Sequence, residues 1–93
     1  METLEEIRAK IDEVDEKMAK LFAERIELAK KAAQCKRAHG LPAEDPGREQ
    51  QILERGAAIF EGAVAEAQDG AAREDYLRFQ KTVIQISKDA QKR

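Results

Sequence analysis

The residue with the clearest chemical significance is Arg25, which occupies a position in an apolar stripe of helical spacing. The stripe leads to it through Leu4, Ile7, Ile11, Val14, Met18 and Leu21 and continues with Leu28, Ala32 and Cys35. The helix therefore neither ends at Arg25 nor turns this face toward water there. Because an unpaired buried guanidinium is costly, we expect an anionic partner, either a protein carboxylate such as that of Glu49 or a bound ligand.

Other polar residues could share a site with Arg25. At about 100° per residue, Lys36 projects within about 20° of Arg25, whereas Arg8 projects about 100° away. One subunit cannot easily aim Arg8 and Arg25 at one spot, but Arg8 of a second chain could reach Arg25 in an antiparallel dimer. Ser87 and Gln91 are four residues apart and share a helix face, although either alone could be an exposed helix residue.

A further polar group, made up of Asp45, Arg48 and Glu49, lies where a second helix would begin. Asp45 could simply cap that helix, and Arg48 could be an exposed residue that pairs with Glu44 or Asp45. The basic residues of the first helix are open to the same interpretation, since the chain has 17 lysines and arginines. Taken singly, none of these residues identifies a site.

A long N-terminal helix must position Arg8, Arg25 and Lys36. No Gly or Pro occurs between Leu4 and Ala38, and Thr3 with Glu6 forms a capping box. The sequence predicts one helix of about 35 residues over 4–38, roughly 50 Å long. Such a helix is longer than a 93-residue globule can cover. We therefore expect a second subunit to cover the rest.

Two shorter helices complete the expected fold. Gly40 suits the left-handed conformation that ends a helix, and Asp45 followed by Pro46 begins the next one, predicted over 46–67. A break at 69–70 separates it from a third helix, predicted over 72–91. The sequence predicts an all-α fold in a single domain, 1–93, with three helices per chain.

Composition limits the partners and the location of the chain. Net charge is −2, so no overall field attracts nucleic acid or an acidic membrane. There is no apolar run long enough to span a membrane, and the acidic start differs from a signal peptide. Cys35 and His39 are the only cysteine and histidine, so we expect no disulfide within the chain, no metal and no cofactor. A reducing, cytoplasmic location fits these features.

The order and spacing of the polar residues resemble the all-helical AroQ class of chorismate mutases over nearly the whole chain. The matching positions are Arg8, Arg25, Lys36, Asp45, Arg48, Glu49, Ser87 and Gln91. The most specific stretches are Ile7-Arg8 with Ile11-Asp12 and Val14-Asp15, Leu21-Phe22-Ala23-Glu24-Arg25, Arg48-Glu49, and Ser87 with Gln91. The resemblance implies an intertwined homodimer with two equivalent sites, each of which borrows Arg8 from the neighbouring subunit.

The resemblance also implies a reaction, the rearrangement of chorismate to prephenate in phenylalanine and tyrosine biosynthesis. It assigns Lys36 and Gln91 to the ether oxygen of chorismate as catalytic donors. The substrate-binding residues that it implies are Arg8 and Arg25 for the carboxylates, Ser87 for a carboxylate, Glu49 and the backbone near Asp45 for the ring hydroxyl, and Arg48 for the pocket wall.

The sequence departs from the family pattern between Glu49 and Ser87, where it is several residues longer than in compact bacterial members. The register of the third helix is anchored on Ser87 and Gln91, because a shift by one would replace them with Ile86 and Ala90. Two other functions stay open. An isochorismate pyruvate-lyase would use the same cations, although Glu49 favours the mutase, and a non-catalytic dimerisation or regulatory module would not need them.

Overall fold

The chain folds into three helices: α1 (Leu4–Ala38), α2 (Pro46–Ala63) and α3 (Gly70–Gln91). The structure is a computed structural model that describes residues 1–64 and 70–93, and no strand occurs in these residues. The expected all-α class and the expected bounds of the first helix are confirmed.

The two shorter helices differ from their predicted bounds. α2 ends at Ala63, where Val64 takes an extended conformation, as its β-branched side chain favours. The expected continuation over 65–67 lies outside the described residues. α3 begins at Gly70, two residues before the predicted start. Glycine is unfavourable mainly in the interior of a helix, so it is compatible with the first position.

The ends of α1 show why it begins and stops where it does. The Thr3 hydroxyl accepts a hydrogen bond from the Glu6 amide at 3.1 Å. At the other end Gly40 has φ 65°, the left-handed conformation that glycine adopts without strain. The Leu41 amide donates to the Lys36 carbonyl at 2.8 Å, and the Gly40 amide donates to the Arg37 carbonyl at 3.3 Å. These two bonds form a Schellman motif, which turns the chain toward α2 directly after Lys36.

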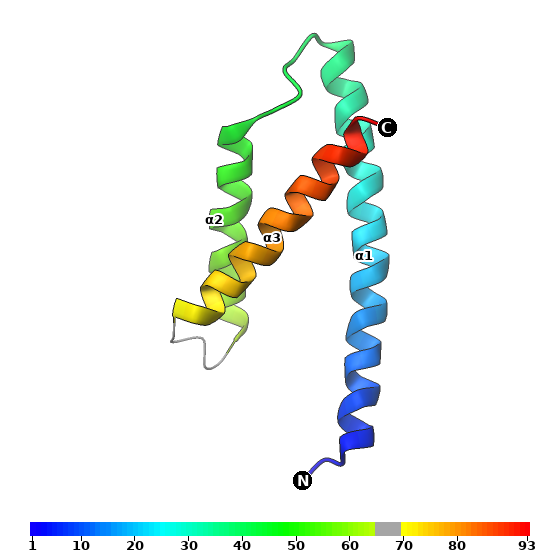
Figure 1. The fold of residues 1–93 in the computed structure, drawn as a ribbon, viewed down its shortest axis with the longest axis vertical. Coiled ribbons are helices and arrows are strands. Elements are labelled where there is room, and N and C mark those ends of the chain that lie inside the picture. Colours follow the sequence, from blue (N-terminus) through cyan, green and yellow to red (C-terminus); the bar gives the residue numbers. More distant parts are fainter. Residues whose placement is uncertain (65–69) are drawn as a thin grey trace.

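α3 is the element that joins the fold together. Figure 1 shows it running diagonally from the end of α2 to the upper half of α1, so that it packs against both helices. Within residues 1–64 and 70–93, α1 and α2 do not approach each other closely. The buried apolar residues are few and mostly small, which allows close helix contact: Ala33, Ala57, Val83, Ile84 and Ala90.

One close approach between α2 and α3 depends on Gly56. The ring of Tyr76 stacks on Phe60 with centroids 5.2 Å apart and planes at 14°. A Cβ at Gly56 would lie 2.9 Å from Cζ of Tyr76 and closer still to its hydroxyl oxygen. Glycine normally weakens the interior of a helix, whereas here it leaves room for the Tyr76 side chain.

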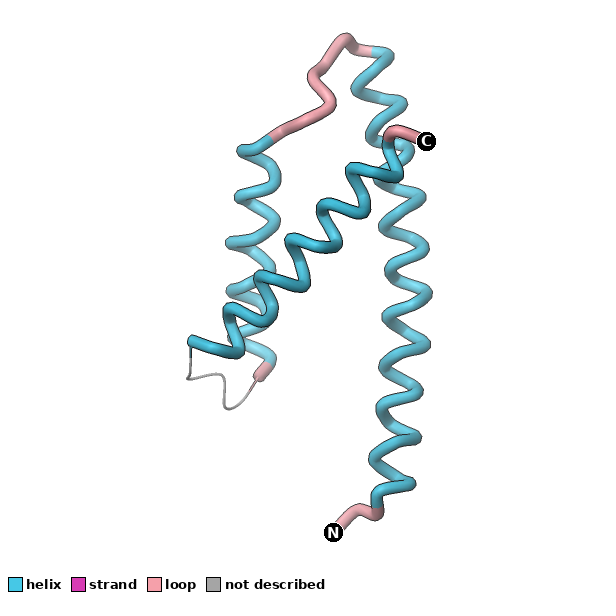
Figure 2. Tube along the Cα trace, in the orientation of Figure 1, coloured by secondary structure: helices cyan, strands magenta, loops and turns pink. Residues whose placement is uncertain are grey.

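The N-terminal half of α1 stands apart from the rest of the chain, as the tube in Figure 2 shows. The radius of gyration is 16.4 Å, against about 12 Å for a compact 93-residue domain. The accessible surface is 7521 Å², whereas a compact monomer of 10.5 kDa exposes roughly 5400 Å². The excess includes the apolar stripe of α1, whose exposed members are Leu4, Ile7, Ile11, Val14, Met18, Leu21 and Leu28.

Three large apolar residues of α2 and α3 are exposed: Ile59, Phe79 and Ile86. They lie on sides of α2 and α3 that no other described element covers. None of the helices in the described residues is both long and apolar enough to cross a membrane.

Candidate active site

A cavity of about 450 Å³ lies between α1, the loop that follows it, and the facing ends of α2 and α3. This volume lies in the range of small-molecule sites. Seven of the eight residues singled out in the sequence line the cavity: Arg25, Lys36, Asp45, Arg48, Glu49, Ser87 and Gln91. Ala29 and Ala32 also line it, and their small side chains leave the space open.

Arg25 lies half-buried at the centre of this arrangement. Its guanidinium donates a hydrogen bond to the Ser87 hydroxyl, which in turn donates to the Val83 carbonyl at 2.8 Å. Among residues 1–64 and 70–93, no carboxylate forms an ion pair with Arg25, so the ion pair considered with Glu49 is absent from this part of the chain. The positive charge of Arg25 is therefore not neutralised by a carboxylate of the described residues.

The surroundings of Arg25 favour an anion. Burial lowers the pKa of Arg25 below its usual value, and the nearby Arg48 guanidinium lowers it further, while Tyr76 acts in the opposite direction. Both leading causes disfavour the positive charge that Arg25 carries. A carboxylate bound beside these two guanidinium groups would relieve the repulsion.

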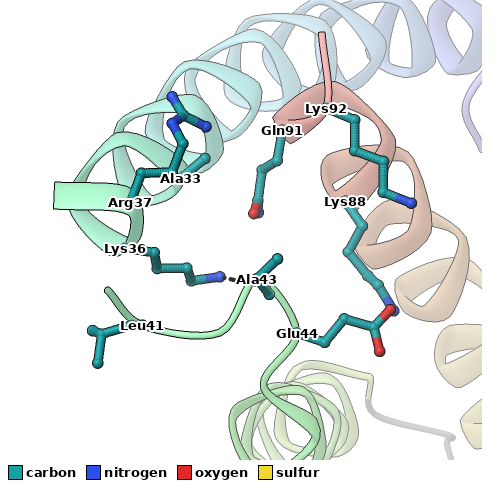
Figure 3. A pocket seen from close by; sticks show the side chains of 9 residues that line it. All are labelled: Ala33, Lys36, Arg37, Leu41, Ala43, Glu44, Lys88, Gln91 and Lys92. Carbon is teal, nitrogen blue, oxygen red and sulfur yellow. Dashed lines mark hydrogen bonds and ion pairs between the residues drawn. The ribbon is translucent and has the colours of Figure 1, made fainter. Parts of the chain in front are cut away.

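Lys36 connects α1 to the loop. Its ammonium donates to the Ala43 carbonyl oxygen at 3.0 Å, the bond drawn as a dashed line in Figure 3. Lysine has three donor hydrogens, so two remain after this bond. An adjoining cavity has a volume of about 170 Å³. Figure 3 shows Lys36 and Gln91 pointing toward the same space from α1 and α3. Donors from two helices thus converge at one edge of the larger cavity.

Gln91 has the position that the expected register of α3 requires. It lines both cavities, and its side-chain amide makes no hydrogen bond within the part of the chain that the structure describes. A register shifted by one residue would instead have assigned the site positions to Ile86 and Ala90. In the structure Ala90 is 1% exposed and Ile86 faces outward. The placement of Ser87 and Gln91 agrees with the register chosen from their spacing.

The first turn of α2 supplies the opposite wall. Asp45 caps this helix by accepting a hydrogen bond from the Arg48 amide at 3.0 Å. The Arg48 guanidinium makes a long contact of 3.5 Å with Gln51 and keeps most of its donors available. Asp45 therefore has the capping role suggested as its structural alternative, and it lines the cavity as well.

Arg8 is the expected site residue that the single chain does not bring to the cavity. It is exposed on the free half of α1, 17 positions before Arg25. At 1.5 Å per residue this separation is about 25 Å along the helix, too far for an arginine side chain to span. Arg8 cannot act at this cavity within its own chain.

Sequence reasoning missed two charged residues of the cavity, Glu44 and Lys88. The Lys88 ammonium lies 3.1 Å from a Glu49 carboxylate oxygen and 3.4 Å from one of Glu44. The available signal was helical spacing, because Ile84, Ser87, Lys88 and Gln91 fall on one face of α3. Glu44 lies in an irregular loop, where spacing gives no such signal.

In the described residues, the fold and the cavity together define a helical protein whose cavity is lined by both cations and carboxylates. The described chain places four cations and three carboxylates around the cavity: Arg25, Lys36, Arg48 and Lys88, with Glu44, Asp45 and Glu49. Lys88 compensates two of the carboxylates, which leaves Arg25 as the most enclosed cation without one.

Comparison with known proteins identifies the family. The model of the chorismate mutase type II family matches residues 7–92, and the chain belongs to this family. Curated relatives include the chorismate mutase of Methanocaldococcus jannaschii, 53% identical over 55 residues. The bifunctional chorismate mutase/prephenate dehydratase of Aquifex aeolicus is 42% identical over 55 residues, and the T-protein of Haemophilus influenzae is 41% identical over 54. The resemblance drawn from the polar residues is confirmed.

The alignments cover part of each protein. They span 59% of this chain and 56% of the Methanocaldococcus jannaschii enzyme. For the Aquifex aeolicus and Haemophilus influenzae proteins they span 59% and 58% of this chain but only 15% and 14% of the relatives. The chain thus matches about half of one relative and a small section of the others. No solved structure matches the chain significantly.

Proposed function

We propose that this chain is a chorismate mutase, which rearranges chorismate to prephenate in an intertwined homodimer. The observation that carries the proposal is the half-buried Arg25, without a carboxylate partner in the described chain, in a cavity that also holds Lys36, Gln91 and Glu49. Chorismate carries two carboxylates, an ether oxygen and a ring hydroxyl. The cavity has groups of the right chemistry for each of these.

Arginines hold the two carboxylates in this proposal. Arg25 supplies one planar fork of donors, which suits a carboxylate better than a lysine ammonium does. The partner's Arg8 supplies the second, because Arg8 of the same chain lies too far away. Ser87 supports this arrangement through its hydrogen bond with Arg25. Arg48 stands on the α2 side and adds positive charge near Arg25.

The rearrangement breaks the ether C–O bond and forms a new C–C bond in one concerted step, with no nucleophile or proton transfer. Negative charge grows on the ether oxygen in the transition state. Donors that are already in place there lower the barrier, because they strengthen as the charge develops. Lys36 and Gln91 act as these donors, since both point into the space between α1 and α3 (Figure 3). The walls of the cavity also hold the substrate in its compact reactive conformer.

Glu49 accepts the hydrogen bond of the ring hydroxyl, and the backbone near Asp45 assists. This contact favours chorismate over isochorismate, whose hydroxyl occupies a different ring position.

The uncovered apolar stripe of α1 forms the dimer interface, which removes the excess apolar surface from water. The cytoplasmic location and the role in phenylalanine and tyrosine biosynthesis stay predictions; fractionation and growth of a deletion strain without these amino acids would test them.

The test is the loss of chorismate absorbance with purified protein, followed by identification of the product, with isochorismate assayed alongside. Conversion of chorismate to prephenate supports the proposal. Consumption of isochorismate alone, with release of pyruvate, would replace it with the lyase function. If neither compound changes, the chain is a binding or dimerisation module.

A further inference from the structure

Lys88 differs from the other cations of the cavity in what it contacts. Its ammonium pairs with two carboxylates, Glu49 at 3.1 Å and Glu44 at 3.4 Å. Arg25 and Lys36 instead donate to neutral oxygens, the hydroxyl of Ser87 and the carbonyl of Ala43. The charge of Lys88 is therefore compensated by acidic groups, whereas Arg25 and Lys36 contact only neutral acceptors within the described residues and can pair with an anionic ligand.

The pairing with Glu49 is the more enclosed of the two. The side chains of Lys88 and Glu49 are 25% and 28% exposed, whereas that of Glu44 is 68% exposed. An ion pair is worth more where water is partly excluded, and a carboxylate left alone there would carry an uncompensated charge. Figure 3 shows Lys88 reaching from α3 across to the loop, with its ammonium beside Glu44. Lys88 thus ties α3 to both the loop and α2.

We propose that Lys88 is a positioning residue, which holds the Glu49 carboxylate in place as the acceptor for the substrate's ring hydroxyl. The inference rests on the proposed function and adds a residue to that site. A carboxylate has about four acceptor positions, so Glu49 can accept from Lys88 and from a hydroxyl together. Lys88 also offsets the negative charge that Glu49 would otherwise present to an incoming dicarboxylate.

The proposal predicts which kinetic constant changes. The ring hydroxyl lies away from the bonds that break and form, so its hydrogen bond is equally strong in the ground state and the transition state. Loss of such an interaction raises KM and leaves kcat nearly unchanged. We expect Lys88→Met to raise KM for chorismate roughly tenfold, the scale of one hydrogen bond to a charged group. Lys88→Arg keeps the charge and donors and should recover most of the wild-type KM.

The decisive experiment is a double-mutant cycle with Glu49→Gln. If Lys88 acts through Glu49, Lys88→Met should add little in the Glu49→Gln background. The matched control is Lys81→Met, which removes the same charge from an exposed position of α3 two turns before Lys88, outside the lining of both cavities. Circular dichroism and thermal unfolding verify the fold, and Lys88→Gln replaces Lys88→Met should that variant fail to fold.

The outcomes separate this inference from the proposed function. A wild-type chain that leaves chorismate unchanged overturns the proposed function and the inference with it. With an active wild type, the inference alone is overturned if Lys88→Met behaves like Lys81→Met. It is also overturned if the full effect of Lys88→Met persists in the Glu49→Gln background, because Lys88 would then act on the substrate directly.

Discussion

Single residues around the cavity divide by how their charge is compensated. Lys88 pairs with two carboxylates, whereas Arg25 has a hydroxyl as its partner and another guanidinium nearby. The chain thus holds Arg25 in a position that costs free energy in the absence of an anion. In the proposed function, binding of a carboxylate would recover that free energy, which would link the unfavourable placement of Arg25 to ligand affinity.

Replacement of Arg25 should separate activity from stability. We expect Arg25→Ala to lose about 2 to 5 kcal/mol of substrate affinity, because it removes one partner of a charged, partly buried contact. The folded chain should not be destabilised, since burial and Arg48 both disfavour the charge that is removed. Steady-state kinetics and thermal unfolding measure the two effects. Arg78→Ala, which removes an exposed arginine of α3, is the control, and full activity of Arg25→Ala would rule out the proposed site.

Gln91 should affect turnover more than binding. If it donates to the ether oxygen, its hydrogen bond strengthens in the transition state, and Gln91→Ala should lower kcat by about a hundredfold with a smaller change in KM. Gln85→Ala removes an amide from an exposed position of the same helix, where Gln85 bonds Asp89, and should leave both constants unchanged. A Gln91→Ala variant with raised KM and normal kcat would remove Gln91 from the ether-oxygen role.

At the scale of the elements, α3 determines the site because it alone packs against both of the other helices. Arg25 on α1 meets Ser87 on α3, and Glu49 on α2 meets Lys88 on α3. The cavity therefore exists only while α3 keeps its register and its distance from α2. Both depend on contacts outside the cavity lining, such as that between Tyr76 and Gly56.

Gly56 should tolerate alanine less well than its helical position suggests. Alanine normally stabilises a helix by up to about 1 kcal/mol relative to glycine. Here the added Cβ would press against Tyr76, and we expect Gly56→Ala to destabilise the fold by about 1 to 3 kcal/mol. Gly62→Ala, also in α2 but facing open space, is the matched control and should be neutral or stabilising. Urea unfolding measures both, and equal behaviour of the two variants would contradict the packing role of Gly56.

Alkaline pH should weaken the ion pair between Lys88 of α3 and Glu49 of α2. Hydrogen bonding to Glu49 raises the pKa of Lys88 above its usual value of 10.5; burial opposes this effect and the bond to Glu44 adds to it. The folded chain therefore holds the Lys88 proton more tightly than the unfolded chain. The stabilisation by the Lys88 ion pairs is complete below the usual lysine pKa, and it disappears as pH rises through the pKa of Lys88 in the folded chain.

The measurement compares wild type and Lys88→Met by urea unfolding at about pH 9 and about pH 11.5, on either side of the usual lysine pKa. We expect the wild type to lose more stability across this interval than the variant, which has no ammonium at position 88 to deprotonate. The same loss in both proteins would show that the Lys88 ion pairs contribute nothing to stability.

At the scale of the whole molecule, the chain is elongated, with extents of 57 × 27 × 16 Å. The free half of α1 carries Arg8 together with most of the exposed apolar stripe. An antiparallel partner helix would cover the stripe and carry its own Arg8 toward the cavity. Burial of the interface and completion of the site would then be the same event.

Mixed dimers test this arrangement. Arg8→Ala and Arg25→Ala should each be nearly inactive alone, whereas a mixture refolded at equal concentrations should recover about a quarter of the wild-type activity. Half of the dimers then contain one chain of each kind, and each of these has one intact site out of two. Sedimentation or native mass spectrometry verifies that heterodimers form. Properly formed heterodimers without activity would count against a shared site.

The sequence by itself determined the helices and their caps, because helical periodicity, Thr3, Gly40 and the Asp45-Pro46 start act locally. The order and spacing of its polar residues, read as a family resemblance, indicated seven of the residues that line the cavity. It also identified Arg25 as unusual from its place in the stripe. Tertiary structure alone decided that Arg25 donates its hydrogen bond to Ser87 and does not pair with Glu49. It also decided that Lys88 forms the ion pair with Glu49, and that Tyr76 packs against the backbone at Gly56. These outcomes depend on how far apart the helices lie and how they cross, which are set by the packing of α3 against two partners and leave no periodic signal in the sequence.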